Sequence, residues 1–504
     1  MSDKTRDIAE EIRTGQAILE ALKSEQGSQN GNGHDESYLL FQSYDDEGNA
    51  QAVNKRHSGQ FLHCLSLGWL HYTGTHWTTK LAESKLERAI VDTLKARGIA
   101  ASMAEDENTD LSKLKTAARP KTANIKNAKF NLSSIVATHI DEFDNSPDLL
   151  NVKNGVLNLK TGELSPHTPE EMFTYCLNTE YKPEADTMEW IEFLWDSLTP
   201  EGKDFSIKEN EEYNELLDFI KCAVGYTLTG QTIEQCMFYV QGPTRAGKGL
   251  FLQTLLKVMG KPLSISIPFD TFTKKRDGDG QNFDLAGLRN SRFAAASESN
   301  KTRMINAETV KNVTGGDETR CAHKNKPYFE YLPKYKIWLA TNNNVVADAS
   351  DDAFWNRLRV INFPNSHAGK EDFGFGNRLQ TKEGLEAVLA WAVEGSMKWY
   401  KDLADGPGLG RPDLIRRLTK VHREENDLVK QFIAECCIVG ENKIATIANM
   451  TAAFKEWCQD RNVDPYRGFR FKESMNNKGF YSKLQSVGGT TKRRWQGIGL
   501  LAEQ

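Results

Sequence analysis

The segment from Gly242 to Gly249 has the residue types that suit binding of phosphate groups. It reads GPTRAGKG and lies between the apolar runs CMFYVQ and LFLQTLL, so we expect a strand, a loop and a helix in that order. In such a unit, N–H groups of the loop and of the helix start face the phosphates, while Lys248 brings a mobile positive charge. The residues predicted to hold a nucleoside triphosphate are Gly242, Pro243, Thr244, Arg245, Ala246, Gly247, Lys248 and Gly249.

One position departs from the usual form of this loop. Gly249 stands where a Ser or Thr hydroxyl ordinarily helps to hold Mg²⁺. Without that hydroxyl, the pattern arises by chance in roughly one in ten chains of this size. Support for a nucleotide site therefore has to come from residues elsewhere in the chain.

Four polar residues downstream occupy positions that suit nucleotide hydrolysis. Glu298 follows the apolar run SRFAAAS, where a carboxylate can hold Mg²⁺ or act on the attacking water. Asn342 follows the run YKIWLAT, where an amide can sense the γ-phosphate or position water. Arg357 and Arg359 flank Leu358, and one of them is predicted to neutralise transition-state charge on the ATP of a neighbouring subunit.

The elements that must position these residues are short apolar strands separated by helices. From Cys236 to Pro364 the strand-like runs are CMFYVQG, PLSISIP, SRFAAAS, YKIWLAT and RLRVINF. Runs of this length and composition favour a mostly parallel sheet that is covered on both faces. The fold class predicted for this region is an α/β nucleotide-binding core.

The composition describes an ordinary globular chain and excludes several classes. With 504 residues, 39% of them hydrophobic, and a formal charge of -5, the chain has neither a membrane span nor a uniformly basic coat for nucleic acid. The charged start MSDKTRDIAEEIRTG lacks a signal-peptide core, which predicts a cytoplasmic protein. The eight cysteines show no metal-ligand spacing, so we expect reduced thiols, no structural zinc, and Cys436 and Cys437 in a helix core.

Four regions are expected along the chain. Residues 1–37 read as a helical arm and a flexible linker, because GSQNGNGHDES is rich in Gly and polar residues. Residues 38–225 mix short strands and helices, with hairpins predicted at GWLHYTGTHWTT and LLNVKNGVLNLKTGELSP. Residues 226–400 hold the nucleotide-binding core, and residues 401–504 form a linker and a further domain.

The last region differs in charge from the rest of the chain. Between Lys443 and Gln504 there are eleven Lys or Arg residues against five Asp or Glu residues, a net of +6. Two helices, at 428–439 and 447–461, are predicted before a basic segment and a hairpin at 481–501. This asymmetry fits a small module that binds nucleic acid through Lys492, Arg493 and Arg494.

These motifs together carry a family resemblance. The loop, ASES, VKNVTGGDETRCAHKNKPYFEYLPKYKIWLATNNN and DDAFWNRLRVINF resemble the superfamily 3 helicase module of phage and plasmid primase-helicases, a lineage shared with poxvirus primase-helicases. Residues 46–77 and 149–171 are similar to the domain before that module, and the basic C-terminal section resembles its winged-helix tail. The resemblance covers about residues 38–504 and implies an AAA+-like fold, ATP and Mg²⁺ as cofactors, and a DNA helicase of a phage, plasmid or mobile element in the bacterial cytoplasm.

The resemblance also implies partners and residue roles. The chain would form a homo-oligomer, a hexameric ring with ATP between subunits and single-stranded DNA in its channel, while the tail engages duplex origin DNA. Lys248 would bind phosphate, Glu298 would be the acid and Mg²⁺ ligand, and Asn342 the polar sensor. Arg357 would be the arginine finger, with Arg359 as the alternative. The segment ETRCAHKNKPYFEYL would be a pore hairpin whose tip holds His323, Lys324 and Lys326; a basic turn between alternating strands independently suits a phosphate backbone.

The departures from this family leave alternatives open. A water or Thr254 can replace the hydroxyl missing at Gly249, and Asp317 can assist Glu298, which is followed by Ser299 rather than a second acid. Only 37 residues precede Tyr38, so we expect no polymerising domain, and priming would come from a separate primase or polymerase. The rival hypotheses are a nucleotide-gated origin-binding or scaffold protein with little hydrolysis, and a defence or signalling ATPase.

Overall fold

The computed structural model describes residues 38–104, 111–200, 211–273, 283–297, 305–322, 328–344, 347–369, 372, 374–461, 465 and 468–501. The chain divides into two compact units, Met1–Ser146 with Pro166–Cys176, and Pro147–Ser165 with Leu177–Gln504. The arm and linker expected at residues 1–37 lie outside the described residues. Within the described part of the chain, no helix has both the length and the apolar character to cross a bilayer.

The first unit combines helices with a small sheet. Its helices are α2 (Tyr38–Phe41), α3 (Asp46–Arg56), α4 (Ala82–Met103), α5 (Leu111–Ala117) and α6 (Thr122–Ile135). Its strands are β1 (Phe61–Cys64), β2 (Gly68–Tyr72), β3 (Trp77–Thr78) and β4 (Ala137–Thr138), in the order β3-β2-β1-β4. The hairpin predicted from GWLHYTGTHWTT is confirmed as β2 and β3. Leu86, Ile90 and Leu94 are fully buried at four-residue spacing on α4, which explains how this long helix anchors the unit.

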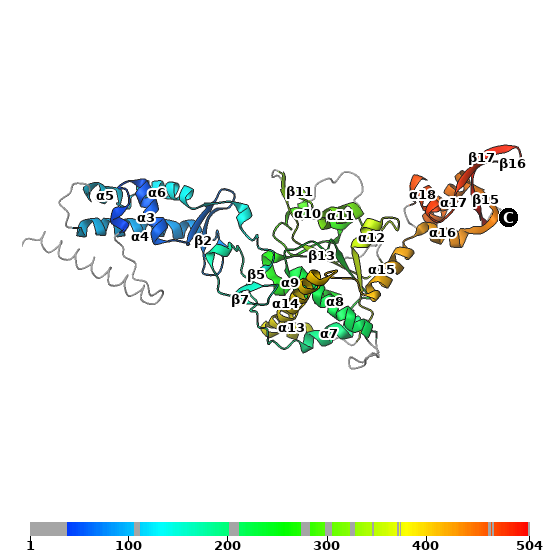
Figure 1. Ribbon diagram of the computed structural model, residues 1–504, viewed down its shortest axis with the longest axis horizontal. Helices are drawn as coiled ribbons and strands as arrows, with labels where there is room; N and C mark the ends of the chain where they lie inside the picture. Colours follow the sequence, from blue (N-terminus) through cyan, green and yellow to red (C-terminus); the bar gives the residue numbers. More distant parts are fainter. Residues whose placement is uncertain are drawn as a thin grey trace, which may run out of the picture. The chain divides into compact units, whose positions relative to one another are not determined.

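The second unit is built on a five-stranded parallel sheet (Figure 1). Its strands are β8 (Met237–Gln241), β9 (Ser264–Pro268), β10 (Phe293–Ser297), β13 (Lys336–Thr341) and β14 (Leu358–Asn362). They pair in the order β14-β8-β13-β10-β9, and every pair is parallel. All five strands predicted from the apolar runs are therefore confirmed, as is the mixed α/β class of this region.

Both faces of this sheet are covered, because most positions of its strands are apolar and buried. On one face, Met237 and Tyr239 of β8 join a core with residues of α10 (Phe283–Ala286), α11 (Ala307–Thr314) and α12 (Asp352–Arg357). On the other face, the ring of Phe238 stacks on Trp338 at 4.1 Å, and Trp338 packs against Phe251 of α9 (Lys248–Leu263). Two-sided burial of this kind is what a parallel sheet between helices requires.

Further helices and two small antiparallel sheets complete the core of the second unit. The helices are α7 (Met188–Leu198), α8 (Glu211–Leu228), α13 (Phe375–Leu379), α14 (Lys382–Asp405) and α15 (Asp413–Glu425). The predicted hairpin at residues 149–158 is confirmed as β5 (Leu149–Val152) and β6 (Gly155–Asn158), with β7 (Leu164–Ser165) added at its edge. The other sheet pairs β11 (Thr319–Ala322) with β12 (Tyr328–Tyr331), so the strands of the predicted pore hairpin are confirmed.

The C-terminal part forms a small module of three helices and three strands. Its helices are α16 (Leu428–Cys436), α17 (Ile447–Asp460) and α18 (Gly468–Asn477). The strands β15 (Cys437–Thr446), β16 (Ser482–Val487) and β17 (Thr490–Leu500) form an antiparallel sheet in the order β15-β17-β16. The expected hairpin is confirmed as β16 and β17, and β15 is a strand that the sequence did not predict.

One prediction about this module is wrong. Only Cys436 lies in the helix, because α16 ends there and Cys437 begins β15. The side chain of Cys437 still joins the module's apolar core, in which Phe454 stacks on Phe471 at 4.6 Å. The apolar character of the segment was thus interpreted correctly, while its change from helix to strand was missed.

Candidate functional site

The loop between β8 and α9 has a backbone that requires its two glycines. Gly242 has a φ of 156°, and a Cβ atom there would lie 2.1 Å from the carbonyl oxygen of Phe363. Gly247 has a φ of 88°, and a Cβ atom there would lie 2.8 Å from Oγ of Ser197. Both positions therefore exclude larger residues by backbone conformation and by contact. This explains in physical terms why the loop begins and ends with glycine.

Lys248 is held inside this loop by three oxygen atoms. Its Nζ donates to the carbonyl oxygens of Gly242 at 2.8 Å and Pro243 at 2.6 Å, and to Oδ1 of Asn342 at 2.9 Å. The residue is only 7% exposed, and burial lowers the pKa of its ammonium to about 8. At neutral pH the group is therefore still mainly protonated, and it presents a desolvated positive charge at the loop.

Lys248 also begins a helix whose first N–H groups have no side-chain cap. Gly247 occupies the cap position of α9, and it has no side chain with which to accept a hydrogen bond. The first N–H groups of an α-helix have no partner within the helix, so they are available to an anion. A buried lysine and an uncapped helix start together make a site that suits phosphate oxygens.

The order of the strands explains why Asn342 reaches Lys248. Asn342 directly follows β13, which pairs with β8, so the carboxyl ends of these two strands lie side by side. The strand β10 pairs with the other edge of β13, and Ser297 at its end is in register with Ala340. Glu298, the predicted acid and Mg²⁺ ligand, is the next residue, but it lies outside the described residues. Its predicted role stays a prediction.

The structure leaves open space at Gly249 and excludes one predicted substitute for its hydroxyl. A Cβ atom at Gly249 would have no heavy atom within 4 Å, and the residue is exposed. Thr254, in contrast, is completely buried on the packed face of α9, and its hydroxyl accepts a hydrogen bond from Gln380 at 3.3 Å. The suggestion that Thr254 replaces the missing hydroxyl is therefore wrong, because its side chain points into the core.

Asp317 also lies away from the loop of its own chain. It is exposed in the turn between α11 and β11, two residues after Gly315. The carbonyl oxygen of Gly315 accepts from the side chain of Gln235 at 3.0 Å, and Gln235 precedes β8. The loop follows the carboxyl end of β8, so Asp317 lies toward the opposite end of this strand. Whether it assists Glu298 stays a prediction, because Glu298 lies outside the described residues.

The wall of the loop comes from residues that sequence reasoning missed. Asn365, after β14, donates to the carbonyl oxygens of Asp196 and Thr199, both at 2.6 Å, and so fixes the end of α7. The next residue, Ser366, donates to the carbonyl oxygen of Thr244 at 2.9 Å, and the N–H of His367 donates to that of Arg245 at 3.1 Å. These residues lie far from the loop in sequence and have no motif of their own, so only the fold brings them together.

Arg357 lies at the amino ends of the strands, whereas the loop follows their carboxyl ends. It ends α12 immediately before β14, and β14 begins in register with the start of β8. Its Nη1 donates to the carbonyl oxygen of Ala353 at 3.0 Å, while its buried Nε has no hydrogen-bond partner among the described residues. A guanidinium in this position is too far along the sheet to serve the loop of its own subunit.

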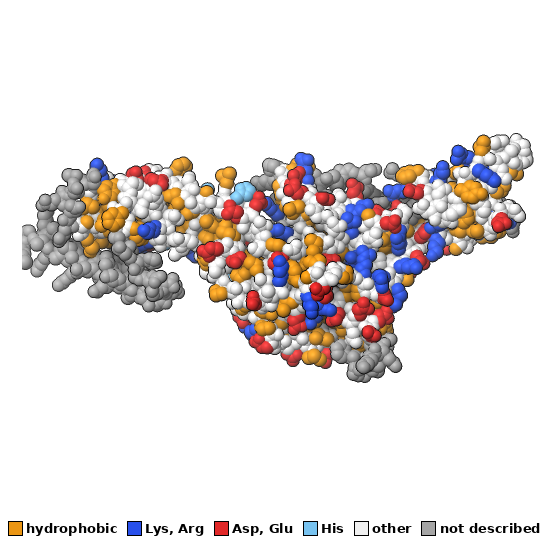
Figure 2. Space-filling view, viewed as in Figure 1, with side chains coloured by type: hydrophobic (Ala, Val, Ile, Leu, Met, Phe, Trp, Pro, Cys, Tyr) orange, Lys and Arg blue, Asp and Glu red, His pale blue; other side chains and the backbone are white. Residues whose placement is uncertain are grey.

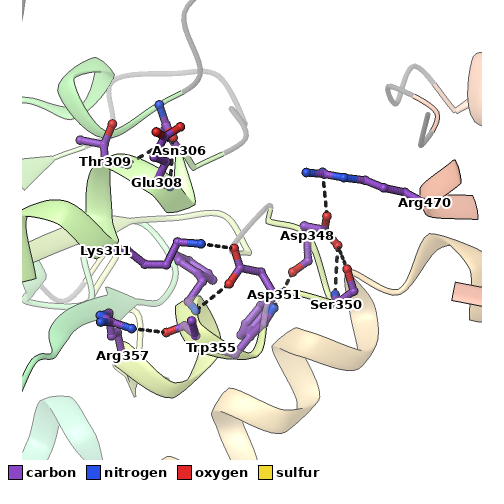
Figure 3. A network of polar contacts seen from close by, with 12 residues as sticks. Asn306, Glu308, Thr309, Lys311, Asp348, Ser350, Asp351, Trp355, Arg357 and Arg470 are labelled. Atoms are coloured by element: carbon purple, nitrogen blue, oxygen red, sulfur yellow. Dashed lines mark hydrogen bonds and ion pairs between the residues drawn. The ribbon is translucent and has the colours of Figure 1, made fainter. Parts of the chain in front are cut away.

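The helix that carries Arg357 is fixed by Asp351 (Figure 3). The carboxylate of Asp351 caps α12 by accepting from the N–H of Phe354 at 3.0 Å, and it pairs with Lys311 at 2.9 Å. Burial alone would raise the pKa of Asp351, but the contact with Lys311 and the N–H of Phe354 outweigh it, so the pKa is lowered. The ionised cap therefore holds α12 in place.

Arg359 occupies a different environment. It is 5% exposed on β14, and its Nη1 donates to the carbonyl oxygens of Asn356 at 2.9 Å and Leu358 at 3.3 Å. These hydrogen bonds stabilise the junction between α12 and β14. Arg359 is therefore buried within its own subunit, whereas Arg357 is only partly buried. Which of the two acts as the finger stays a prediction.

Comparison with known proteins matches both halves of this architecture. Residues 50–198 match the family model described as D5 N terminal like. Residues 240–357, from the end of β8 to Arg357, match a model described as a family of unknown function (DUF5906). A chain from Acanthamoeba polyphaga mimivirus, named "Putative helicase L207/L206", is 24% identical over 336 residues, which are 62% of this chain and 33% of that protein.

The chain fits the D5-like primase-helicase lineage. "Putative helicase 022R" of Frog virus 3 is 26% identical over 46% of this chain and 25% of that protein. "Putative primase C962R" of African swine fever virus is 21% identical over 69% of this chain and 37% of that protein. The alignments with these three viral proteins thus span between a quarter and about two fifths of their lengths.

The residues that the primase-helicase resemblance assigns to DNA are only partly described. His323, Lys324 and Lys326 lie outside the described residues, between the ends of β11 and β12. In the C-terminal module, Lys492 and Arg493 are exposed on β17, and Arg494 is partly buried. These three residues pair with Gln485, Leu484 and Lys483 of β16, so they lie along one hairpin arm.

Proposed function

We propose that this chain is an ATP-dependent DNA helicase, which acts in DNA replication as a ring with ATP sites between its subunits. The observation that carries the proposal is the set of contacts of Lys248, whose buried ammonium meets three oxygen atoms at an uncapped helix start. Relatives named as helicases and primases of large DNA viruses support replication as the process. The source in a phage, plasmid or mobile element stays a prediction.

The loop residues suit the phosphates of ATP. The β- and γ-phosphate oxygens would take the place of the carbonyl oxygens as partners of Lys248, while N–H groups of the loop and of α9 bind the remaining oxygens. Asn342 would then be released from Lys248 to position the attacking water or to contact the γ-phosphate. Its observed hydrogen bond to Lys248 supports this, because the two side chains share one location.

Mg²⁺ fits this site through fewer protein ligands than usual. When bound, the ion neutralises charge that develops between the β- and γ-phosphates. Gly249 supplies no hydroxyl and Thr254 is buried, so within this chain the ligation falls to Glu298, with water and phosphate oxygens completing the shell. Magnesium binding should therefore be weaker than in a loop that ends in Lys-Ser or Lys-Thr.

Replacing Gly249 tests this account of the metal site. We expect Gly249→Ser to lower the Mg²⁺ concentration that gives half-maximal ATP hydrolysis, because the position is open and the new hydroxyl can reach the ion. Gly249→Ala is the matched control, since it adds the same Cβ atom without the oxygen. Equal Mg²⁺ requirements in the two variants would show that the missing hydroxyl does not limit metal binding.

We propose that Arg357 acts on the ATP of the neighbouring subunit. Its position at the amino ends of the strands, opposite the loop, requires a partner copy if it is to reach a nucleotide. In a head-to-tail ring, each subunit would then supply a loop on one side and an arginine on the other.

DNA would be bound by two parts of the chain. The tip between β11 and β12, with His323, Lys324 and Lys326, would contact a single strand in the channel. The C-terminal module would be the winged-helix domain, with α18 as its recognition helix and Lys492, Arg493 and Arg494 on the wing. Its helices and its three-stranded antiparallel sheet support this assignment.

Strand separation tests the proposed function. With a forked DNA duplex labelled at one end, we expect release of a single strand when ATP and Mg²⁺ are present, and none with a nonhydrolysable ATP analogue. The second candidate, a nucleotide-gated origin-binding or scaffold protein, is favoured by Gly249, which weakens the metal site. Nucleotide-dependent DNA binding without strand release would support that candidate instead.

A further inference from the structure

Two helices of the second unit carry charged stripes of opposite sign. On α7, Glu189, Glu192 and Asp196 recur at spacings of three and four residues, and all three are exposed. On α15, Arg416, Lys420 and Arg423 recur at spacings of four and three. Residues with these spacings lie on one face of a helix. We call these two surfaces the acidic stripe and the basic stripe.

The acidic stripe lies beside the nucleotide loop. It belongs to α7, whose Ser197 and Phe193 lie against Gly247 of the loop. The carboxylate of Asp196 is 70% exposed and lies 3.6 Å from His367, while that of Glu189 is 46% exposed and pairs with Arg378. These contacts lie at the surface, where ion pairs are weak and rearrange easily. The stripe is therefore free to meet another charged surface.

The basic stripe lies beside the candidate arginine finger. It borders a pocket of about 200 Å³ between α12 and α15, whose floor includes the buried side chains of Trp355 and Leu358. The cations around this pocket are Arg411, Arg416, Lys420 and Arg423, and none of the described residues that line it is acidic. Figure 2 shows Lys and Arg side chains gathered over the region of α15.

The basic stripe keeps its charge available despite local ion pairs. Arg416 pairs with Asp413, Arg423 with Asp352, and Lys420 lies 3.9 Å from Glu424. The side chain of Lys420 is 77% exposed and that of Arg416 is 62% exposed. An apolar floor with a cationic rim suits a partner that offers carboxylates together with an apolar contact. The acidic stripe has this composition, because Met188 beside it is 52% exposed.

We propose that the acidic stripe of one copy docks on the basic stripe of the next copy, and so brings the loop of the first to Arg357 of the second. Two observations support a second copy as the partner. The two stripes have opposite charges, and one lies beside the nucleotide loop while the other lies beside Arg357. The interpretation of that site as an ATP site shared by two subunits rests on the proposed function. The docking itself is a property of the surfaces and can be measured without ATP turnover.

Charge reversal on each stripe tests the docking. One variant carries E189K, E192K and D196K, a second carries R416E, K420E and R423E, and a third combines all six changes. A control carries E211K and E215K on α8, which alter exposed acids outside both stripes. The mass of the full-length protein is measured over a concentration series with Mg²⁺ and a nonhydrolysable ATP analogue. Thermal unfolding checks that each variant is folded.

We expect wild type and control to assemble, and each single-stripe variant to need about tenfold or more higher concentration. The six-change variant should recover most of the assembly, because the charges are again complementary. Assembly of the single-stripe variants at wild-type concentration would overturn the proposal. The docking proposal would also be wrong if the folded six-change variant stayed monomeric, or if wild type did not assemble.

Two further readouts distinguish this proposal from DNA binding by α15 and from the proposed function. If the basic-stripe variant assembles normally but loses binding to single-stranded DNA, then α15 is a surface for phosphate groups of DNA, and the docking proposal is wrong. If charge exchange restores assembly while wild type shows no ATP turnover, then the docking stands and the proposed function fails. The two proposals therefore fail in distinguishable ways.

Discussion

Lys248→Ala should reduce ATP turnover by about 10³-fold or more. The substitution removes the buried ammonium that faces the loop, and alanine leaves no charge to compensate the phosphates. It also removes three hydrogen bonds, so Asn342 loses the partner that now fixes it. The measurement is steady-state phosphate release with saturating Mg²⁺ and ATP.

A matched variant on the same helix separates this effect from damage to α9. Lys257 is exposed on α9, and its Nζ donates to Gln380 at 2.5 Å. Lys257→Ala should keep nearly full turnover, and both variants should unfold at temperatures close to that of wild type. Comparable turnover in Lys248→Ala and wild type would show that hydrolysis does not depend on this loop.

Arg357→Ala should also reduce turnover by about 10³-fold or more, while changing ATP binding much less. The guanidinium is expected to contact charge that develops only in the transition state, so its loss mainly lowers kcat. Arg88→Ala is the control, because Arg88 is an exposed arginine of the first unit whose side chain is 73% accessible. A rise in KM without a fall in kcat would contradict the role of a finger.

Mixing the two inactive variants makes this prediction sharper. In rings that contain both Lys248→Ala and Arg357→Ala subunits, some interfaces pair an intact loop with an intact arginine. Turnover should therefore return in part when the two proteins are combined under conditions that allow subunits to exchange. If the mixture stays as inactive as its components although it forms mixed oligomers, the ATP site is not shared between subunits.

Much of the parallel sheet could be predicted from the sequence because its signals are local. The runs around Phe238, Ala295 and Trp338 each contain four successive apolar residues that are all buried, and a strand that is buried on both faces needs this pattern. The polar residue after each run then falls at the carboxyl end of its strand, and in the structure Asn342 follows β13 and accepts a hydrogen bond from Lys248. Its role as a sensor stays a prediction. The short apolar runs sufficed to predict the strands, whereas their order came from the structure.

Other features could not be predicted, because they depend on which face of an element is buried. Thr254 looked available by its distance from Lys248 along the chain, but the face of α9 that carries it packs into the core. Asp317 was considered as an acid that could assist Glu298, but it lies toward the other end of β8 from the loop. The spacing of residues along the chain does not show which face of a helix is buried. It also does not show at which end of a strand a residue lies.

The wall around the loop shows the same limit. Asn365 and Asp196 are held together by a hydrogen bond across 169 residues of sequence, and neither belongs to a recognisable motif. The start of β15 at Cys437 was missed for a related reason, because a short apolar segment suits the end of a helix and the start of a strand equally well. Tertiary contacts decide such cases.

The most direct measurement is steady-state ATP hydrolysis with Mg²⁺, in the presence and absence of single-stranded DNA, alongside Lys248→Ala. We predict turnover that single-stranded DNA stimulates and that the variant loses, which would establish a nucleic-acid motor with a loop that tolerates Gly249. Binding of ATP without turnover in either condition would contradict the account, because the protein would then act as a nucleotide-gated switch or scaffold.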